Sequence, residues 1–302
     1  MPAIAFHRPL LSLSLTICSG LLTQACHPCL GSDLEKGSPA ELFTPVQLQK
    51  HLADPTWRIL DARRSAQYDA GHIPGAVHVD AGQWRRRSGQ PDGLEDAQFW
   101  TDAVAKLGID RNMAAVVYAD NVADMARVWW LLAYVGVPRV AMLDGGWQAW
   151  ELADLPRQTE VPRVRMGDFH AEFATEWLVK TERPAWSRKS ADVQIIDARS
   201  RDEYTGGRAL GGAAGRIPAA IHLDWLDVLD SQGCFRKAGE LRELLTSKGI
   251  APKQRQVVYC YSGARSSVVV FALRRIGYHR VSNYYGGWQQ WAAADLRTET
   301  GE

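Results

Sequence analysis

The chain contains two copies of one sequence unit, and this repeat constrains its fold more than any other feature. Residues 116–137 (VVYADNVADMARVWWLLAYVGV) align without gaps with residues 257–278 (VVYCYSGARSSVVVFALRRIGY). The match extends to the tryptophan that follows a Gly-Gly pair in each copy, Trp147 and Trp288. Because 302 residues suffice for two domains that each bury a core, the repeat predicts two similar domains.

Two further blocks upstream repeat in the same order. Residues 59–68 (ILDARRSAQY) match 195–204 (IIDARSRDEY), and GHIPGAVHVD matches GRIPAAIHLD further on. In each copy short apolar runs alternate with helical stretches, which is typical of an α/β fold with parallel strands and helices on both faces of the sheet. We expect the following organisation: a first domain over 40–155, a Pro- and charge-rich linker over 156–165 and a second domain over 166–297.

Cys260 lies at the end of one of these apolar runs. The residues before it read as a strand, and those after it read as a tight loop and then a helix with apolar side chains at helical spacing. In such a loop successive backbone N–H groups point inward, and the helix N-terminus adds roughly half a positive charge. That environment favours a thiolate over a thiol and an oxyanion beside it, for which Arg265 offers a planar cation. The segment predicts a reactive cysteine within an anion site.

The competing interpretation of Cys260 is an inert, buried cysteine at a strand end, since free cysteine is among the most buried residue types. The small and polar run that follows it favours the reactive interpretation, because such residues suit an anion-binding loop better than a core. That run comprises Ser262, Gly263, Arg265 and Ser266.

The repeated blocks together resemble the tandem-domain rhodaneses, the thiosulfate and mercaptopyruvate sulfurtransferases. The resemblance rests on D-A-R-x-x-x-x-Y, G-x-I-P-x-A, a strand-end cysteine with a six-residue loop, and G-G-W, in that order. It implies two rhodanese-like domains, each a mostly parallel central sheet flanked by helices, of which normally only the second keeps the cysteine. Ala119 stands at the place of Cys260 in the first copy, so we expect that domain to be catalytically inactive.

The resemblance also implies a mechanism. Cys260 would take the outer sulfur of thiosulfate as a persulfide and pass it to cyanide or a thiol acceptor, with no metal or organic cofactor. The expected binding residues form the loop after the nucleophile: Tyr261, Ser262, Gly263, Ala264, Arg265 and Ser266.

The loop sequence CYSGAR leaves several alternatives open. It departs from the loops typical of both long-studied branches, so 3-mercaptopyruvate remains the alternative donor to thiosulfate. A non-enzymatic persulfide carrier, or a module that binds a protein acceptor, also fits these residues. Related cysteine phosphatases and arsenate reductases have a loop one residue longer, and the six residues from Cys260 to Arg265 therefore favour sulfur.

The two copies differ or agree at informative places outside the loop. The second copy has a glycine-rich insertion, residues 205–214, which is either a flap near the site or a plain surface loop. It also has Arg216 where the first copy, like the family, has a histidine, His72. Side chains present in both copies are expected to be scaffold: two tryptophans for packing, Trp147 and Trp288, and two polar networks, Asp61 with Arg63 and Asp197 with Arg199.

Composition excludes some classes of partner. A formal net charge of +1 argues against binding to nucleic acid, because no basic excess is available to neutralise phosphates. The short basic run at 85–87 is interpreted as a solvated turn. Cys26 and Cys29 have no second pair at metal-ligand spacing, so no metal site is expected, and Cys234 is interpreted as a structural loop residue.

The N-terminus resembles an export signal. Residues 10–22 form an apolar stretch that is too short to span a membrane but suits the core of a signal peptide over 1–25. Cleavage after Ala25 would give a soluble periplasmic or exported protein, whereas acylation of Cys26 would give a membrane-anchored lipoprotein. The alternative is an apolar helix that stays on the protein.

Overall fold

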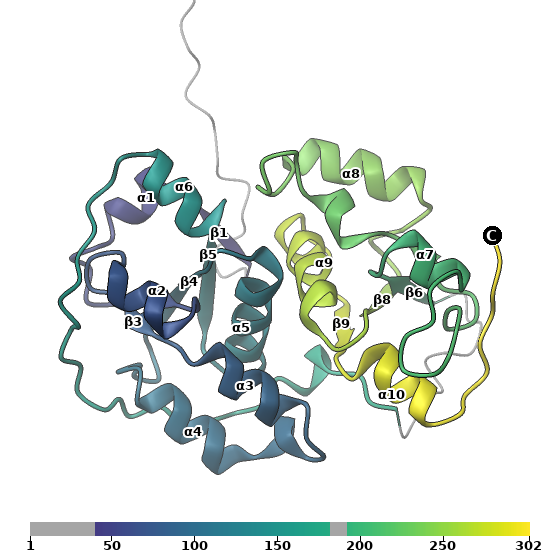
Figure 1. Cartoon of the computed structure of the whole chain (residues 1–302), viewed down its shortest axis with the longest axis horizontal. Coiled ribbons are helices and arrows are strands. Elements are labelled where there is room, and N and C mark those ends of the chain that lie inside the picture. Colours follow the sequence, from purple (N-terminus) through teal and green to yellow (C-terminus); the bar gives the residue numbers. More distant parts are fainter. Residues whose placement is uncertain (1–39, 182–191) are drawn as a thin grey trace, which may run out of the picture. The chain divides into compact units, whose positions relative to one another are not determined.

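Two parallel sheets, one in each sequence copy, form the framework of the chain (Figure 1). The structure is a computed structural model that describes residues 40–181 and 192–302. The expected signal peptide and Cys26 lie outside the described residues. The first sheet has the order β1-β5-β4-β2-β3, with strands Glu41–Phe43 (β1), Trp57–Asp61 (β2), Val77–His78 (β3), Ala114–Tyr118 (β4) and Arg139–Leu143 (β5). The second has the order β7-β6-β8-β9, with strands Val193–Asp197 (β6), Ile221–His222 (β7), Arg255–Tyr259 (β8) and Val281–Tyr284 (β9).

Every strand pair in these sheets is parallel, and the register repeats between the copies. Asp61 pairs with Tyr118 in the first sheet, and Asp197 pairs with Tyr259 in the second. The strand β4 is buried at all five positions, as expected for a central parallel strand whose sequence is a continuous apolar run. The predicted α/β class is confirmed.

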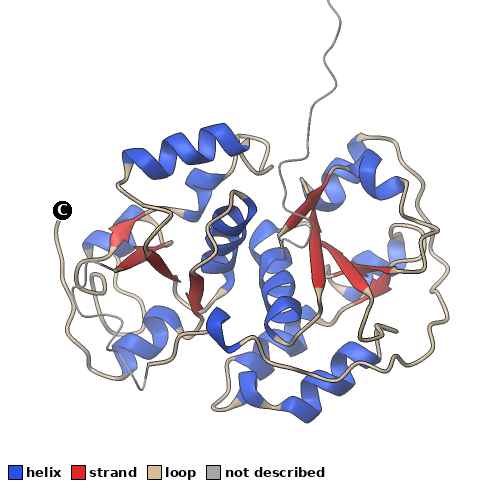
Figure 2. Cartoon of the chain, turned by 180° about the vertical axis from the view of Figure 1, so that it is seen from behind, coloured by secondary structure: helices blue, strands red, loops and turns tan. Residues whose placement is uncertain are grey.

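Helices lie on both faces of the two sheets (Figure 2). In the first copy they are Pro45–Gln49 (α1), Ser65–Ala70 (α2), Ala81–Ser88 (α3), Ala97–Ala105 (α4), Val122–Tyr134 (α5) and Gly146–Leu152 (α6). In the second they are Arg201–Thr205 (α7), Ala238–Ser247 (α8), Ala264–Arg275 (α9) and Gly287–Ala293 (α10). Short 3-10 helices span Gly93–Glu95 (η1), Thr175–Trp177 (η2) and Trp225–Val228 (η4).

The helices α5 and α9 occupy equivalent places in the two copies and pack against each other. The ring of Trp129 on α5 meets the ring of Phe271 on α9 edge to face, with centroids 4.9 Å apart. Both rings belong to one apolar core that includes residues of both copies. Because aromatic pairs of this kind bury large areas, the packing ties the two domains together.

The basic run at 85–87 is helical, whereas the sequence predicted a turn. Asp80 accepts a hydrogen bond from the backbone of Gln83 at 2.7 Å and so caps the N-terminus of α3. Arg85 and Arg86 are exposed on the last turn, where cations interact favourably with the helix dipole.

Candidate active site

Cys260 lies at the carboxyl end of β8, directly before the loop that leads into α9. Cys260 is buried, with 1% of its surface exposed. In an open α/β sheet, ligands bind beyond the carboxyl ends of the strands, which is the position that the sequence predicted for this cysteine. Gly263 is the N-cap of α9 with a φ of 88°, and a Cβ there would lie 2.6 Å from the ring of Tyr285. Only glycine therefore allows this loop to pass so close to that ring.

The backbone N–H groups of the loop are available to a ligand. Within the described part of the chain, none of the N–H groups of residues 261–266 donates a loop, turn or cap hydrogen bond. The first N–H groups of a helix have no partner within the helix, and together they attract an anion. The structure thus brings all six predicted binding residues around one loop: Tyr261, Ser262, Gly263, Ala264, Arg265 and Ser266.

Ser266 is buried on the first turn of α9, with its hydroxyl oxygen 3.4 Å from Cys260 Sγ. The same hydroxyl lies 2.8 Å from Asn283 Oδ1 and 3.1 Å from the carbonyl oxygen of Gly263. A hydroxyl carries a single proton, so these three acceptors compete for it. When the sulfur is an anion it is the strongest acceptor of the three, and the proton then stabilises it. Asn283, on β9, was missed from the sequence because only the fold brings β9 beside the loop.

Arg265 forms a two-pronged ion pair with Glu203 of α7. Its Nη1 and Nη2 atoms lie 2.6 Å and 2.9 Å from the two carboxylate oxygens. Burial raises the pKa of Glu203, but the stronger combined effect of Arg265 and of Ser200 lowers it to about 2. The pair uses two of the five N–H donors of a guanidinium, so it orients Arg265 and offsets part of its charge. A difference between the copies could have revealed this pair, because Gln67 and Asp124 stand at these two places in the first domain.

The repeated Asp-x-Arg pairs form buried polar networks in both domains, as predicted. Arg199 contacts Asp197 at 2.6 Å and donates to the carbonyl oxygen of Gly215 at 2.7 Å, and its guanidinium lies over the Trp288 ring. In the first domain Arg63 makes the equivalent contacts with Asp61, Gly71 and Trp147. These buried networks tie the strand end to the following loop in each copy.

The Gly-Gly-Trp motif closes over the strand end that carries the nucleophile. The backbone N–H of Trp288 donates to the carbonyl oxygen of Cys260 at 2.8 Å, and a Cβ on Gly287 would lie 2.3 Å from that oxygen. In the first domain Trp147 and Gly146 make the same approach to Ala119. The glycine is therefore required for close backbone contact, in addition to the packing role predicted for the tryptophan.

The glycine-rich insertion of the second domain lies against the cysteine loop. The carbonyl oxygen of Leu210 accepts a hydrogen bond from the Trp288 indole at 3.1 Å, and a Cβ on Gly211 would lie 3.5 Å from the Tyr261 hydroxyl. The exchange of histidine for arginine preserves one contact, because Arg216 lies over the ring of Tyr204 as His72 stacks on Tyr68.

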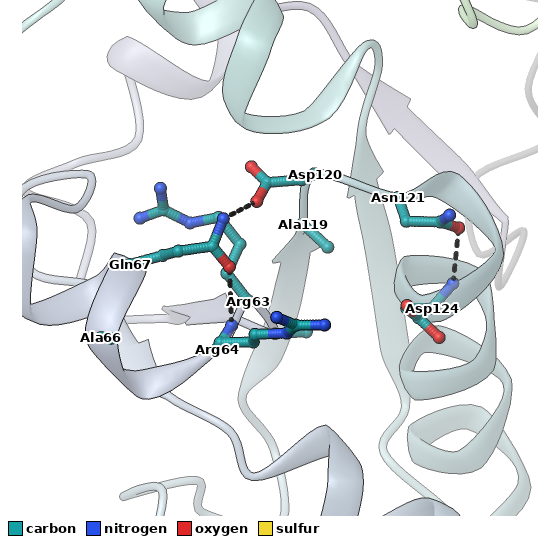
Figure 3. A pocket seen from close by; sticks show the side chains of 9 residues that line it. Arg63, Arg64, Ala66, Gln67, Ala119, Asp120, Asn121 and Asp124 are labelled. Atoms are coloured by element: carbon teal, nitrogen blue, oxygen red, sulfur yellow. Dashed lines mark hydrogen bonds between the residues drawn. The ribbon is translucent and has the colours of Figure 1, made fainter.

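The first domain has a pocket of about 600 Å³ at the place that corresponds to Cys260 in the second (Figure 3). Ala119 lies at its floor, with Asp120 and Asp124 on the loop and first turn of α5. Gln67 of α2 donates to the Asp120 carboxylate. The pocket therefore has no nucleophile, and carboxylates replace the neutral and cationic groups found in the second domain.

The remaining cysteine of the described chain is a poor nucleophile. Burial and the nearby carboxylates of Asp144 and Asp230 raise the pKa of Cys234 to about 11. Among residues 40–181 and 192–302, no cluster of three potential metal ligands is present. In the same ranges no helix is both long and apolar enough to cross a membrane.

The site geometry agrees with a comparison to known families. The model of the rhodanese-like domain matches residues 44–153 and 185–294. The chain belongs to the rhodanese family. The resemblance noted in the sequence is thereby confirmed, and this tandem rhodanese is a sulfurtransferase.

Relatives with named activities align with most of the tandem rhodanese. The thiosulfate sulfurtransferase of Azotobacter vinelandii is 32% identical over 83% of this chain and 93% of that protein. The sulfur carrier protein TtuD of Thermus thermophilus is 32% identical over 84% of this chain and 94% of that protein. The 3-mercaptopyruvate sulfurtransferase of Escherichia coli is 30% identical over 83% of this chain and 95% of that protein. The solved structure of SseA from Escherichia coli superposes with a TM-score of 0.70 at 26% identity, covering 82% of this chain and 98% of that one.

Proposed function

We propose that this rhodanese is a thiosulfate sulfurtransferase that works through a persulfide on Cys260. The Cys260 thiolate attacks the outer sulfur of thiosulfate, the sulfur–sulfur bond of the donor breaks, and sulfite leaves with the bonding electron pair. The persulfide sulfur then passes to cyanide, giving thiocyanate, or to a thiol acceptor, and the Cys260 thiolate is restored.

The observation that carries this proposal is the set of N–H groups of residues 261–266 around Cys260, which have no partner in the loop. They can hold the anionic donor and then the anionic persulfide, and Ser266 can donate to the charged sulfur at 3.4 Å. Arg265, oriented by Glu203, adds positive charge for the sulfonate end of the donor. A sulfonate has three oxygens for these donors, which favours thiosulfate over the planar carboxylate of mercaptopyruvate.

The decisive experiment is mass spectrometry of the protein after exposure to thiosulfate. We expect an adduct of about 32 Da on Cys260 that disappears on addition of cyanide. The Cys260→Ser protein should fold and remain unmodified, because Ala119 shows that the same scaffold accepts a small residue at that strand end. Normal turnover of Cys260→Ser would remove the proposed nucleophile.

Two finer alternatives are separated by the choice of donor and acceptor. The E. coli relative named above supports 3-mercaptopyruvate as the donor, and the Thermus relative supports a carrier that hands its sulfur to a protein. Turnover with both donors under the same conditions decides the first. A persulfide that forms but passes to neither cyanide nor small thiols would favour the carrier.

Export is part of the same proposal. We infer that a signal over 1–25 directs the protein to the periplasm or beyond, with Cys26 as a lipid anchor or as the first residue of a soluble form. The mass of the mature N-terminal peptide from membrane and soluble fractions tests both forms. An unprocessed chain in the cytoplasm would contradict export.

A further inference from the structure

Arg127 is a buried arginine of the first domain that makes no salt bridge to a carboxylate of the described residues. It lies on α5, is 5% exposed, and forms no salt bridge within the described residues. Its Nε atom is buried without a hydrogen-bond partner in the same part of the chain. Buried charges in proteins are ordinarily paired, since an isolated charge in the interior is costly. An unpartnered buried donor on a cation suits an anion that comes from outside the folded chain.

Tyr285 connects Arg127 to the loop of Cys260. Arg127 Nη1 donates to the Tyr285 hydroxyl at 2.8 Å, and Ser88 of α3 lies 2.8 Å from the same hydroxyl. The Tyr285 ring passes so close to Gly263 that a Cβ there would lie 2.6 Å from it. Two residues of the first domain thus hold a ring that packs on the cysteine loop of the second.

Several neighbouring groups act on the pKa of Arg127. Burial lowers the pKa of Arg127, but the Tyr285 hydroxyl, then Cys260, and then Asp124 raise it above its ordinary value. The effect of Cys260 exceeds that of Asp124, which lies one turn away on the same helix. Tyr285 is thus the contact that links this cation to the loop that carries Cys260.

We propose that Arg127, supplied by the inactive first domain, binds the anionic end of the sulfur donor beside Cys260. The assignment rests on the sulfurtransferase function proposed above and adds a second cation to the site. Arg265 is paired with Glu203, whereas Arg127 has a buried Nε without a hydrogen-bond partner in the described part of the chain. The place of Arg127 in the second copy is taken by Val268, so the cation belongs to one half of the repeat only. The first domain would thus have lost its nucleophile and kept a role in the reaction of its partner.

The test measures anion binding in a Cys260→Ala background, where no sulfur transfer can occur. The probes are thiosulfate and pyruvate, titrated by calorimetry, because they present a sulfonate and a carboxylate respectively. Adding Arg127→Gln to the Cys260→Ala protein should lower the affinity for whichever probe binds by about tenfold or more, the range for losing a hydrogen bond to a charged group. Arg127→Lys should recover part of the loss, since it restores the charge without the planar fork.

The matched control is Arg274→Gln on α9. Arg274 is a half-buried arginine whose Nε is likewise buried and unpartnered, but it stacks on Trp177 and donates to the carbonyl oxygen of Val281. Its substitution should leave anion affinity unchanged. Thermal unfolding completes the comparison: removing an unpaired buried charge should leave the protein as stable or more stable, whereas a purely structural Arg127 would destabilise it on removal.

Unchanged anion affinity in Arg127→Gln, or no anion binding to Cys260→Ala at all, would overturn the assignment. Should Arg127→Gln fail to fold, Arg127→Met removes the charge with an apolar chain that suits a buried site and is judged in the same way. Failure of the proposed function looks different: the wild-type protein would bind the anion through Arg127 but form no persulfide.

Discussion

At the scale of single residues, the site depends on which acceptor receives one hydroxyl proton. Ser266 Oγ is within reach of Cys260 Sγ, Asn283 Oδ1 and the carbonyl oxygen of Gly263. A neutral thiol leaves the proton with the oxygen acceptors, whereas a thiolate or persulfide attracts it. Ser266 is thus a switchable donor rather than a fixed cap of the helix.

We expect Ser266→Ala to slow persulfide formation on Cys260 by about tenfold, because the charged sulfur loses one hydrogen bond. Stopped-flow measurement of the thiosulfate step reports the effect. The neighbouring Ser267→Ala is the matched control, since the Ser267 hydroxyl bonds Gly263 and Asn283 but not the sulfur. Equal losses in both variants would mean that Ser266 only supports the loop.

The ion pair between Arg265 and Glu203 makes a second residue-scale prediction, for pH. Arg265 lowers the pKa of Glu203 to about 2 against the ordinary value of 4.5, despite burial. A carboxylate with a lowered pKa stabilises the fold above its unfolded pKa and loses that contribution as the pH falls toward its folded pKa. The contribution is therefore complete above pH 4.5 and disappears between 4.5 and 2.

Denaturant unfolding of wild type and Glu203→Gln across this range measures the effect. We expect Glu203→Gln to be less stable at neutral pH by on the order of 2 kcal/mol, with the gap closing below pH 4.5. Asp96→Asn is the comparison, because the Arg87–Asp96 pair is partly exposed and its loss should change the stability much less than the loss of Glu203. A gap that stays constant down to pH 2 would show that the charge of Glu203 is irrelevant to stability.

At the scale of elements, the N-terminus of α10 closes on the end of β8. Gly287 has a φ of 56°, in the left-handed region, and a Cβ there would lie 2.3 Å from the carbonyl oxygen of Cys260. Gly146 has a φ of 58° and faces Ala119 in the same way. The two glycines thus make the same contact in the two copies, once at Cys260 and once at Ala119.

Replacing either glycine by alanine should destabilise the chain by about 2 kcal/mol or more, since both the backbone conformation and the close approach are lost. Only Gly287→Ala should also slow sulfur transfer measured on the folded fraction, because it displaces the backbone of Cys260. Gly146→Ala is therefore the control for Gly287→Ala. Equal activity of the two folded proteins would show that this glycine contact does not affect sulfur transfer.

At the scale of the whole molecule, the two copies of one unit differ at the end of the central strand and in the loop after it. The strand-end position holds Cys260 in one copy and Ala119 in the other, and the position of Arg265 is taken by Asp124 in the first domain. A carboxylate at that place opposes both thiolate formation and the approach of an anionic donor. The first domain therefore differs from the second in the charge of its loop as well as in its nucleophile.

This asymmetry predicts that Ala119→Cys alone does not create a second site. Mass spectrometry in a Cys260→Ala background should show little sulfur on the new cysteine after thiosulfate treatment. Adding Asp120→Ser and Asp124→Arg should increase the modification, because the two charges are then removed or reversed. Persulfide on Ala119→Cys at the rate seen for Cys260 would show that loop charge does not matter.

The sequence by itself determined the features that consecutive residues encode. Apolar runs followed by turn residues are local signals, so the strand, loop and helix around Cys260, the parallel α/β class and the duplication could all be predicted. The loss of the nucleophile at Ala119 followed from aligning the copies. The three-arginine run was placed wrongly in a turn, although Asp80 at the N-cap position of α3 is a local signal for a helix start.

The contacts that complete the site were decided only by the tertiary structure. Asn283 reaches the loop because β9 pairs with β8, and Arg127 and Ser88 reach it because the first domain packs on the second. Glu203 on α7 forms an ion pair with Arg265 on α9, a helix far from it in the sequence. These partners are far apart in sequence, and their proximity depends on how whole elements pack, which no local pattern of residue types specifies.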